Sequence, residues 1–164
     1  MTALLAPTRN CYRRFRPHCY APTHVCWGRD NRSCAIRVVG AGPGGRLECR
    51  LGGAAANPYL AAAGLVAAGI LGLVEDPPLP PPVAGDASEA AGLSPLPATL
   101  EQALRALEAD EALCALLGAP LVEGFLAAKR HELDRARRAI ADDDAATPEA
   151  RVDPWEWDEY AEFL

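Results

Sequence analysis

The sequence lacks the marks of a secreted or zinc-binding protein. Its six cysteines include no C-x-x-C pair, and its first ten residues hold no apolar core of the kind that a signal peptide needs. Cys19, His24 and Cys26 lie close together in the chain, but their spacing fits no standard zinc pattern. We therefore expect free thiols and a cytoplasmic protein.

The sequence also lacks an apolar run of the roughly 20 residues that a membrane span needs. The longest apolar stretch lies within residues 57–74, and its three glycines lower its hydrophobicity. Asn57 is a good N-cap and Pro58 suits the first helical position. Because the stretch is apolar on every side, we expect a buried packing helix over residues 57–76 and no contact with a membrane.

Negative charge is scarce in the first third of the chain. The net charge is −6, yet residues 1–50 hold nine arginines against only Asp30 and Glu48, while residues 51–164 are acidic. The basic third therefore attracts anions. Nucleic acid is not the expected partner, because these arginines lie among predicted strand residues rather than along one helix face.

A β-hairpin is predicted in this basic third. Residues 33–39 form one expected strand and residues 46–51 the next, and four glycines and a proline lie in the loop 40–45 between them. The second strand alternates strictly between charged and apolar residues, which places its charged side chains on one face. If Val39 pairs with Arg46, then Arg37 falls opposite Glu48.

One face of this hairpin would carry charges of both signs. Its members are Arg37, Arg46, Glu48 and Arg50. Such a face suits a polyphosphate, a divalent metal and a carboxylate, but the residues alone favour a solvated outer surface.

The loop 40–45 also satisfies G-x-G-x-x-G, the pattern with which many flavin and NAD domains begin. That pattern must open a helix whose N-terminus faces the pyrophosphate. Here the residues that follow have the period of a strand, so we consider a flavin- or NAD-binding protein as an alternative and disfavour it.

The rest of the chain predicts helices around a proline-rich connector. Residues 77–98 form the connector, and residues 99–164 form a helical tail that begins at the cap Thr99. In the long helix of this tail, the side chains expected to face inward are Leu121, Val122, Phe125, Ala128 and Leu133. The expected fold class is α+β, an antiparallel hairpin plus packing helices, with residues 1–56 forming the active-site loop and hairpin.

Three blocks of sequence resemble a known enzyme family. NCYRRFRPHCYAPTHVCWGRDNRS (10–33), RLECR (46–50) and ANPYLAAAGLVAAGILGL (56–73) are similar in order and spacing to the C-terminal part of the glutamine synthetase catalytic domain, and so is the tail near PWEWDEY. The segment 27–32, WGRDNR, resembles the branch that makes γ-glutamyl-polyamines and γ-glutamyl-ethanolamide. The resemblance implies an ATP-dependent ligase that phosphorylates the glutamate γ-carboxylate and joins it to ammonia or an organic amine.

The resemblance also implies a role for each matching residue. Arg32 would be catalytic, acting on the transferring phosphate of ATP, and Arg37 and Arg46 would bind the nucleotide phosphates. Arg14 and Arg50 would hold glutamate, and Glu48 would bind Mg²⁺ or Mn²⁺.

The sequence departs from the family in two respects. Tyr20 stands where enzymes that use ammonia carry a glutamate. Family members are also more than twice as long, so the other metal ligands and most of the ATP pocket are not in this sequence. We expect the C-terminal portion of such a domain, inactive alone, whose full-length form is a ring-shaped homo-oligomer; the alternative is a non-catalytic docking module.

Overall fold

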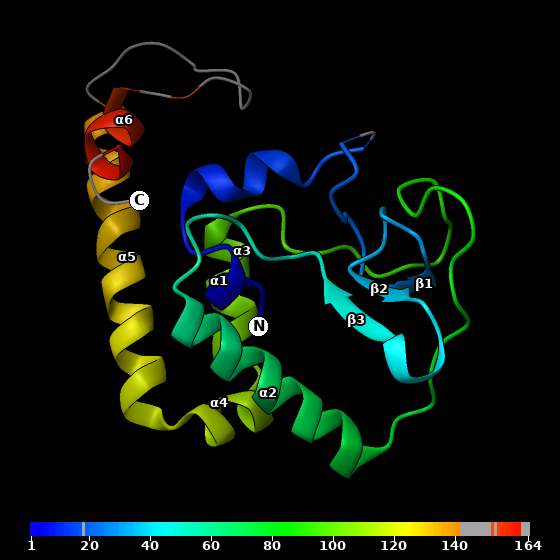
Figure 1. The fold of residues 1–164 in the computed structure, drawn as a ribbon. Coiled ribbons are helices and arrows are strands. Elements are labelled where there is room, and N and C mark those ends of the chain that lie inside the picture. Colours follow the sequence, from blue (N-terminus) through cyan, green and yellow to red (C-terminus); the bar gives the residue numbers. More distant parts are fainter. Residues whose placement is uncertain (18, 142–151, 153, 162–164) are drawn as a thin grey trace.

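The computed structural model describes residues 1–17, 19–141, 152 and 154–161, and Figure 1 shows how their elements are arranged. The elements, in chain order, are α1 (Thr2–Leu5), the 3₁₀ helix η1 (Arg9–Arg14), β1 (Trp27–Arg29), β2 (Ile36–Val39), the 3₁₀ turn η2 (Gly42–Gly44), β3 (Arg46–Cys49), α2 (Pro58–Glu75), α3 (Leu100–Glu108), α4 (Glu111–Leu117), α5 (Ala119–Ala141) and α6 (Pro154–Tyr160). A small sheet lies beside a group of helices, which confirms the predicted α+β class. Parts of the predicted helical tail, at 142–151, 153 and 162–164, lie outside the described residues.

The predicted hairpin and its register are confirmed, but both strands are shorter than predicted: β2 begins at Ile36 rather than at residue 33, and β3 ends at Cys49 rather than at residue 51. β2 and β3 are antiparallel, with Val39 opposite Arg46 and Arg37 opposite Glu48. The prediction of a purely antiparallel hairpin was incomplete, because β1 pairs in parallel with β2 and makes the sheet mixed. His24, which precedes β1, forms an isolated bridge with Pro95 instead of belonging to the strand.

The helices share one hydrophobic core. Leu4 of α1, Leu100 and Leu107 of α3 and Leu113 of α4 are almost completely buried. The predicted cap of α3 is present, because the Thr99 hydroxyl accepts from the backbone N–H of the third residue of the helix. Asp110 caps α4 in the same way.

In α5 the predicted inner face is wrong in one position. Ala128 is exposed, whereas Leu126, which was not predicted, is buried together with Val122. The buried side chains at 122 and 126 follow the spacing of one helix face, and position 128 lies off that face.

The proline-rich connector is more ordered than the predicted spacer. The Trp27 indole Nε1 donates to the Pro80 carbonyl at 2.7 Å, and the Val83 N–H donates to the Trp27 carbonyl at 2.9 Å. Ala87 is completely buried. β1 is an edge strand, so its outer backbone groups need partners, and the connector provides one for the Trp27 carbonyl.

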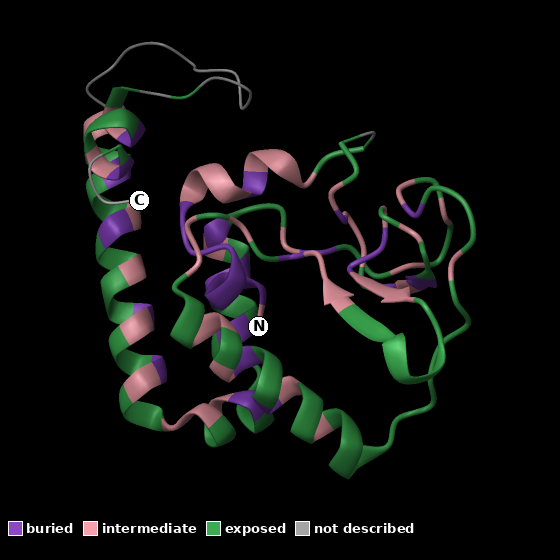
Figure 2. Cartoon of the chain, viewed as in Figure 1, coloured by how far each residue is buried: buried purple, intermediate pink, exposed green. Residues whose placement is uncertain are grey.

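The apolar helix α2 forms where it was predicted, capped by the Asn57 side chain, but it is not buried. Figure 2 shows much of α2 as exposed, and only Gly64 and Ala67 are buried. The described residues contact one face of the helix and leave the other open. By length and composition, with a mean hydropathy of 1.6 over 18 residues, α2 is also a helix that could cross a membrane.

Candidate active site

The charged face of the sheet is organised around Glu48. Arg37 Nη1 donates to Glu48 Oε2 at 3.2 Å, and Arg50 Nη1 donates to the other carboxylate oxygen. Arg37 Nη2 also donates to Asp30 Oδ1 at 3.1 Å. The hydrogen bond from Arg50, and then the positive charges of Arg50 and Arg37, lower the pKa of the Glu48 carboxyl.

Arg50 joins this sheet to two loops that come earlier in the chain. Its Nε donates to the Arg32 carbonyl at 2.8 Å, and its Nη2 donates to the Tyr20 carbonyl at 3.0 Å. Because one guanidinium holds Glu48 and both loops, the loop around Tyr20 and the turn around Arg32 are fixed beside the same strand end.

Arg14 reaches the same place from η1. Its Nη2 donates to the Arg50 carbonyl at 2.9 Å and to the Leu51 carbonyl at 2.6 Å. Burial lowers the pKa of the Arg14 guanidinium, although the group remains a cation at neutral pH. The two residues that the resemblance assigned to glutamate, Arg14 and Arg50, are therefore in direct contact.

The turn that carries Arg32 is fixed by its neighbours in sequence. Asn31 Nδ2 donates to the carbonyls of Val83 and Gly85 at 3.0 and 2.8 Å, and the Ala87 N–H donates to Ser33 Oγ at 2.8 Å. The Arg32 residue itself is exposed. Our sequence interpretation missed Asn31 and Ser33 as positioning residues, although their places on either side of Arg32 in N-R-S were a signal for it.

Arg46 lies at the far end of β3, at the edge of the charged face. It is exposed and lies two residues from Glu48, on the same side of the strand. The glycine loop before it contains the turn η2 and leads directly into β3. The flavin or NAD alternative therefore lacks the helix that it requires.

The described residues do not form a metal site by themselves. Among them, no group of three or more histidine, cysteine, aspartate and glutamate side chains could hold a metal ion. Both oxygens of Glu48 are held by arginines. A divalent metal usually keeps several oxygen ligands, so Glu48 could serve as one ligand only if others were added.

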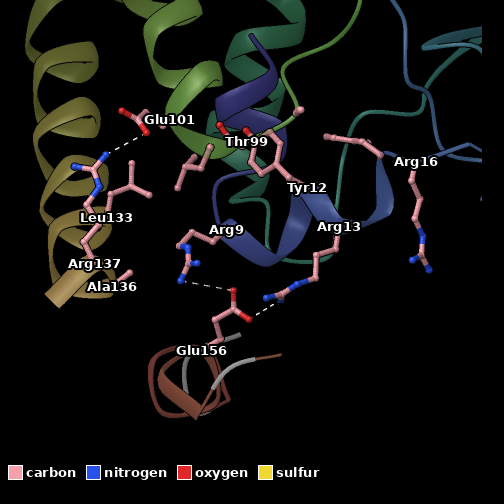
Figure 3. A pocket seen from close by; sticks show the side chains of 13 residues that line it. Arg9, Tyr12, Arg13, Arg16, Thr99, Glu101, Leu133, Ala136, Arg137 and Glu156 are labelled. Carbon is pink, nitrogen blue, oxygen red and sulfur yellow. Dashed lines mark ion pairs between the residues drawn. The ribbon is translucent and has the colours of Figure 1, made fainter. Parts of the chain in front are cut away.

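A cavity of about 870 Å³ lies elsewhere, between η1, α3, α5 and the C-terminal α6 (Figure 3). Most of its charged groups are paired: Arg13 Nη1 lies 2.5 Å from Glu156 Oε2, and Arg137 Nη2 lies 3.1 Å from Glu101 Oε2. None of the six residues assigned from the resemblance lines this cavity, so we take the charged sheet face, and not this cavity, as the candidate active site.

Comparisons with known proteins show the family to which the chain is similar. The family model described as the glutamine synthetase catalytic domain matches residues 1–148. The γ-glutamylethanolamide synthetase GlnA4 of Streptomyces coelicolor is 45% identical over 139 residues, which cover 85% of this chain and 30% of that protein. The glutamate–methylamine ligase of Methyloversatilis universalis is 37% identical over 100% of this chain and 36% of its own length.

A solved structure described as a GmaS/ADP complex superposes with a TM-score of 0.73 at 30% identity, and the match covers 98% of this chain and 36% of that one. The chain thus spans about a third of the length of the relatives that it matches.

Proposed function

Because the chain belongs to the glutamine synthetase catalytic-domain family, we propose that it supplies the arginine side of the active site of an ATP-dependent ligase. The ligase would phosphorylate the γ-carboxylate of glutamate and join it to ammonia or an organic amine. The observation that carries this proposal is the position of Arg50, which holds Glu48 and the backbone of both Arg32 and Tyr20.

Arginine suits each role that we propose. Phosphoryl transfer depends mostly on positioning and on stabilisation of negative charge, and a guanidinium keeps its charge and offers planar, paired donors. Arg32 would act on the transferring phosphate, Arg37 and Arg46 on the nucleotide phosphates, and Arg14 with Arg50 on the carboxylate of glutamate. Asn31 and Ser33 would fix the backbone of Arg32 and leave its side chain to the phosphate.

Glu48 is the ligand that we propose this chain contributes to a Mg²⁺ or Mn²⁺ ion. The ion would neutralise phosphate charge when it is bound. The remaining ligands would have to come from outside the described residues.

The loop at Tyr20 supports an organic amine as the preferred acceptor. The Tyr20 residue is 74% exposed, while its carbonyl is held by Arg50 at the edge of the charged face. A phenol hydroxyl has no negative charge with which to attract an ammonium ion, and it is a much weaker proton acceptor than a carboxylate. An amine with a carbon tail can gain apolar contacts instead.

The activity belongs, in this proposal, to an assembly larger than this chain. The chain alone would be inactive, since among the described residues no group of three or more side chains could hold a metal ion. The same shortage of ligands favours the second candidate function, a docking module without catalysis. A ring-shaped homo-oligomer and a cytoplasmic setting remain proposals for the complete enzyme.

A chimaera separates the two functions. In it, residues 1–164 of this chain replace the matching segment of the M. universalis glutamate–methylamine ligase. We expect release of ADP that requires both glutamate and an amine, whereas this chain alone gives none. A folded chimaera without such turnover would support the docking module and contradict the ligase proposal.

A further inference from the structure

The connector after α2 begins with five prolines and one leucine, PPLPPP (77–82), which the proposed ligase site does not use. The ring of each proline fixes φ, and a residue that precedes proline is restricted to extended conformations. These two restrictions favour polyproline II, a left-handed helix with about three residues per turn and a rise of about 3.1 Å per residue. The segment is therefore stiff, extended and about two turns long.

The side chains of this segment lie at the surface. Each of residues 77–82 is exposed, and Figure 2 shows the chain that follows α2 as a run of exposed residues. Leu79 is 74% exposed. Because residues three apart share a face of a polyproline II helix, Pro78 and Pro81 lie on one face and Leu79 and Pro82 on another. The segment thus offers apolar side chains on more than one face.

The backbone of the segment is held in place near its C-terminal end. The Trp27 indole Nε1 donates to the Pro80 carbonyl at 2.7 Å, and the Val83 N–H donates to the Trp27 carbonyl at 2.9 Å. Asn31 Nδ2 donates to the Val83 carbonyl at 3.0 Å. A segment that is already ordered loses little conformational entropy when it binds a partner, so this anchoring favours recognition.

The sequence around the segment is acidic. Glu75 and Asp76 immediately precede it and are both exposed. No lysine or arginine occurs between residues 51 and 104. A partner with positive charge beside an apolar groove would complement these acids, whereas an acidic partner would be repelled.

We propose that residues 77–82 dock into a protein domain whose groove is lined by aromatic side chains and flanked by lysine or arginine. Aromatic-lined grooves bind exposed polyproline II segments, because such segments are preformed and lose little entropy on binding. The inference does not depend on the proposed ligase activity, since none of the six residues assigned to that activity lies in the segment.

Titration of the full chain with an SH3 domain and with a WW domain tests this docking. We expect saturable binding, tighter for the domain with the more positive groove. Pro78→Ala together with Pro81→Ala should weaken this binding at least tenfold, because both rings are lost from the same face. Pro43→Ala is the matched control: Pro43 is exposed but lies in the turn η2, so its substitution should leave the affinity unchanged.

The acidic flank gives a second readout that alters no proline. Glu75→Gln together with Asp76→Asn should weaken the binding several-fold and reduce its dependence on salt concentration. Asparagine tolerates the left-handed backbone at position 76, where φ is 43°, so the end of α2 should be preserved. Circular dichroism and the melting temperature check that each variant is folded. Leu79→Glu, which keeps all five prolines, replaces the double proline variant if that variant does not fold.

Three results would overturn the proposal. The first is no saturable binding by either domain at millimolar concentration, and the second is binding that the loss of Pro78 and Pro81 leaves unchanged. The third is self-association of this chain that the same two substitutions abolish, because the partner would then be a second copy. An unaltered salt dependence in the variant of Glu75 and Asp76 would overturn the basic flank of the groove.

Discussion

Arg37 lies directly opposite Glu48 in the pair β2–β3, and its Nη1 donates to Glu48 Oε2 at 3.2 Å. The pair is the centre of the charged face, because the second oxygen of Glu48 is held by Arg50 and the second Nη of Arg37 by Asp30. The carboxylates of Asp30 and Glu48 thereby balance the charges of Arg37 and Arg50. These ion pairs hold β2, β3 and the residue after β1 together before any phosphate binds.

The lowered pKa of Glu48 predicts how the pair responds to pH. A carboxyl whose pKa is lower in the folded state stabilises the fold fully above its ordinary value of 4.5 and loses that contribution as pH falls through the folded value. We expect Glu48→Gln to lower the urea concentration at the midpoint of unfolding at pH 7. This difference from the unsubstituted chain should diminish as the pH falls below about 4.5. Glu123→Gln, a substitution on the exposed side of α5, is the control. An effect of Glu48→Gln that grows toward acid pH would contradict this account.

The cysteines should differ in reactivity. Cys34 is completely buried, and burial followed by its contact with Cys26 raises the pKa of its thiol to about 12, so the reactive thiolate is scarce at pH 8. Cys19 is exposed. Brief iodoacetamide treatment followed by peptide mass spectrometry should show Cys19 alkylated first and Cys34 only after unfolding in urea. Equal alkylation rates for Cys19 and Cys34 in the native chain would contradict the burial of Cys34.

Tyr160 should stabilise the attachment of α6 to α5. Its hydroxyl donates to Glu132 Oε1 at 2.5 Å, and Glu132 is buried. Tyr160→Phe leaves that oxygen short of a partner, so we expect a loss of about 1–3 kcal/mol in the free energy of unfolding, measured with urea. Trp157→Phe on the same helix, at an exposed position, should cost no more than about 0.5 kcal/mol. Similar losses for both variants would argue against a specific role of the hydroxyl.

The amine preference should depend on Tyr20. In the chimaera we expect Tyr20→Glu to lower the ratio of kcat/KM for ethanolamine or putrescine over that for ammonia at least tenfold. A carboxylate would attract ammonium and accept its proton, whereas each buried CH₂ of an organic amine gives only about 0.8 kcal/mol. Tyr20→Phe should keep the original preference. An unchanged ratio in Tyr20→Glu would show that this loop does not determine the amine preference.

Local patterns were sufficient to predict the charged face. Strict alternation from Arg46 to Arg50 and a loop of six residues fixed the register, and the family match supplied Arg14 from a segment that alternation could not place. Capping residues such as Thr99 and Asp110 likewise fixed helix starts, because a cap is a local interaction.

Contacts between distant segments could not be predicted in the same way. The hydrogen bond from Trp27 to Pro80 joins residues 53 positions apart, and no local pattern signals it. The burial of α2 was predicted from its composition, yet Leu73 is exposed, because composition does not tell which side of a helix the rest of the fold covers. In α5 we predicted that Ala128 faces inward, whereas the buried residue is Leu126, two positions earlier.

The turnover of the chimaera with Arg32→Gln shows whether the charged sheet face serves phosphoryl transfer. Removing a cation from the transferring phosphate should lower kcat for ADP release at least a hundredfold, or about 2.7 kcal/mol in transition-state stabilisation, with a smaller change in the KM for glutamate. Arg29→Gln is the matched control: Arg29 is exposed on β1 and pairs with Val38, which points away from the face of Arg37. The account predicts near-normal turnover for Arg29→Gln and a collapse for Arg32→Gln. Equal turnover in the two variants would contradict it.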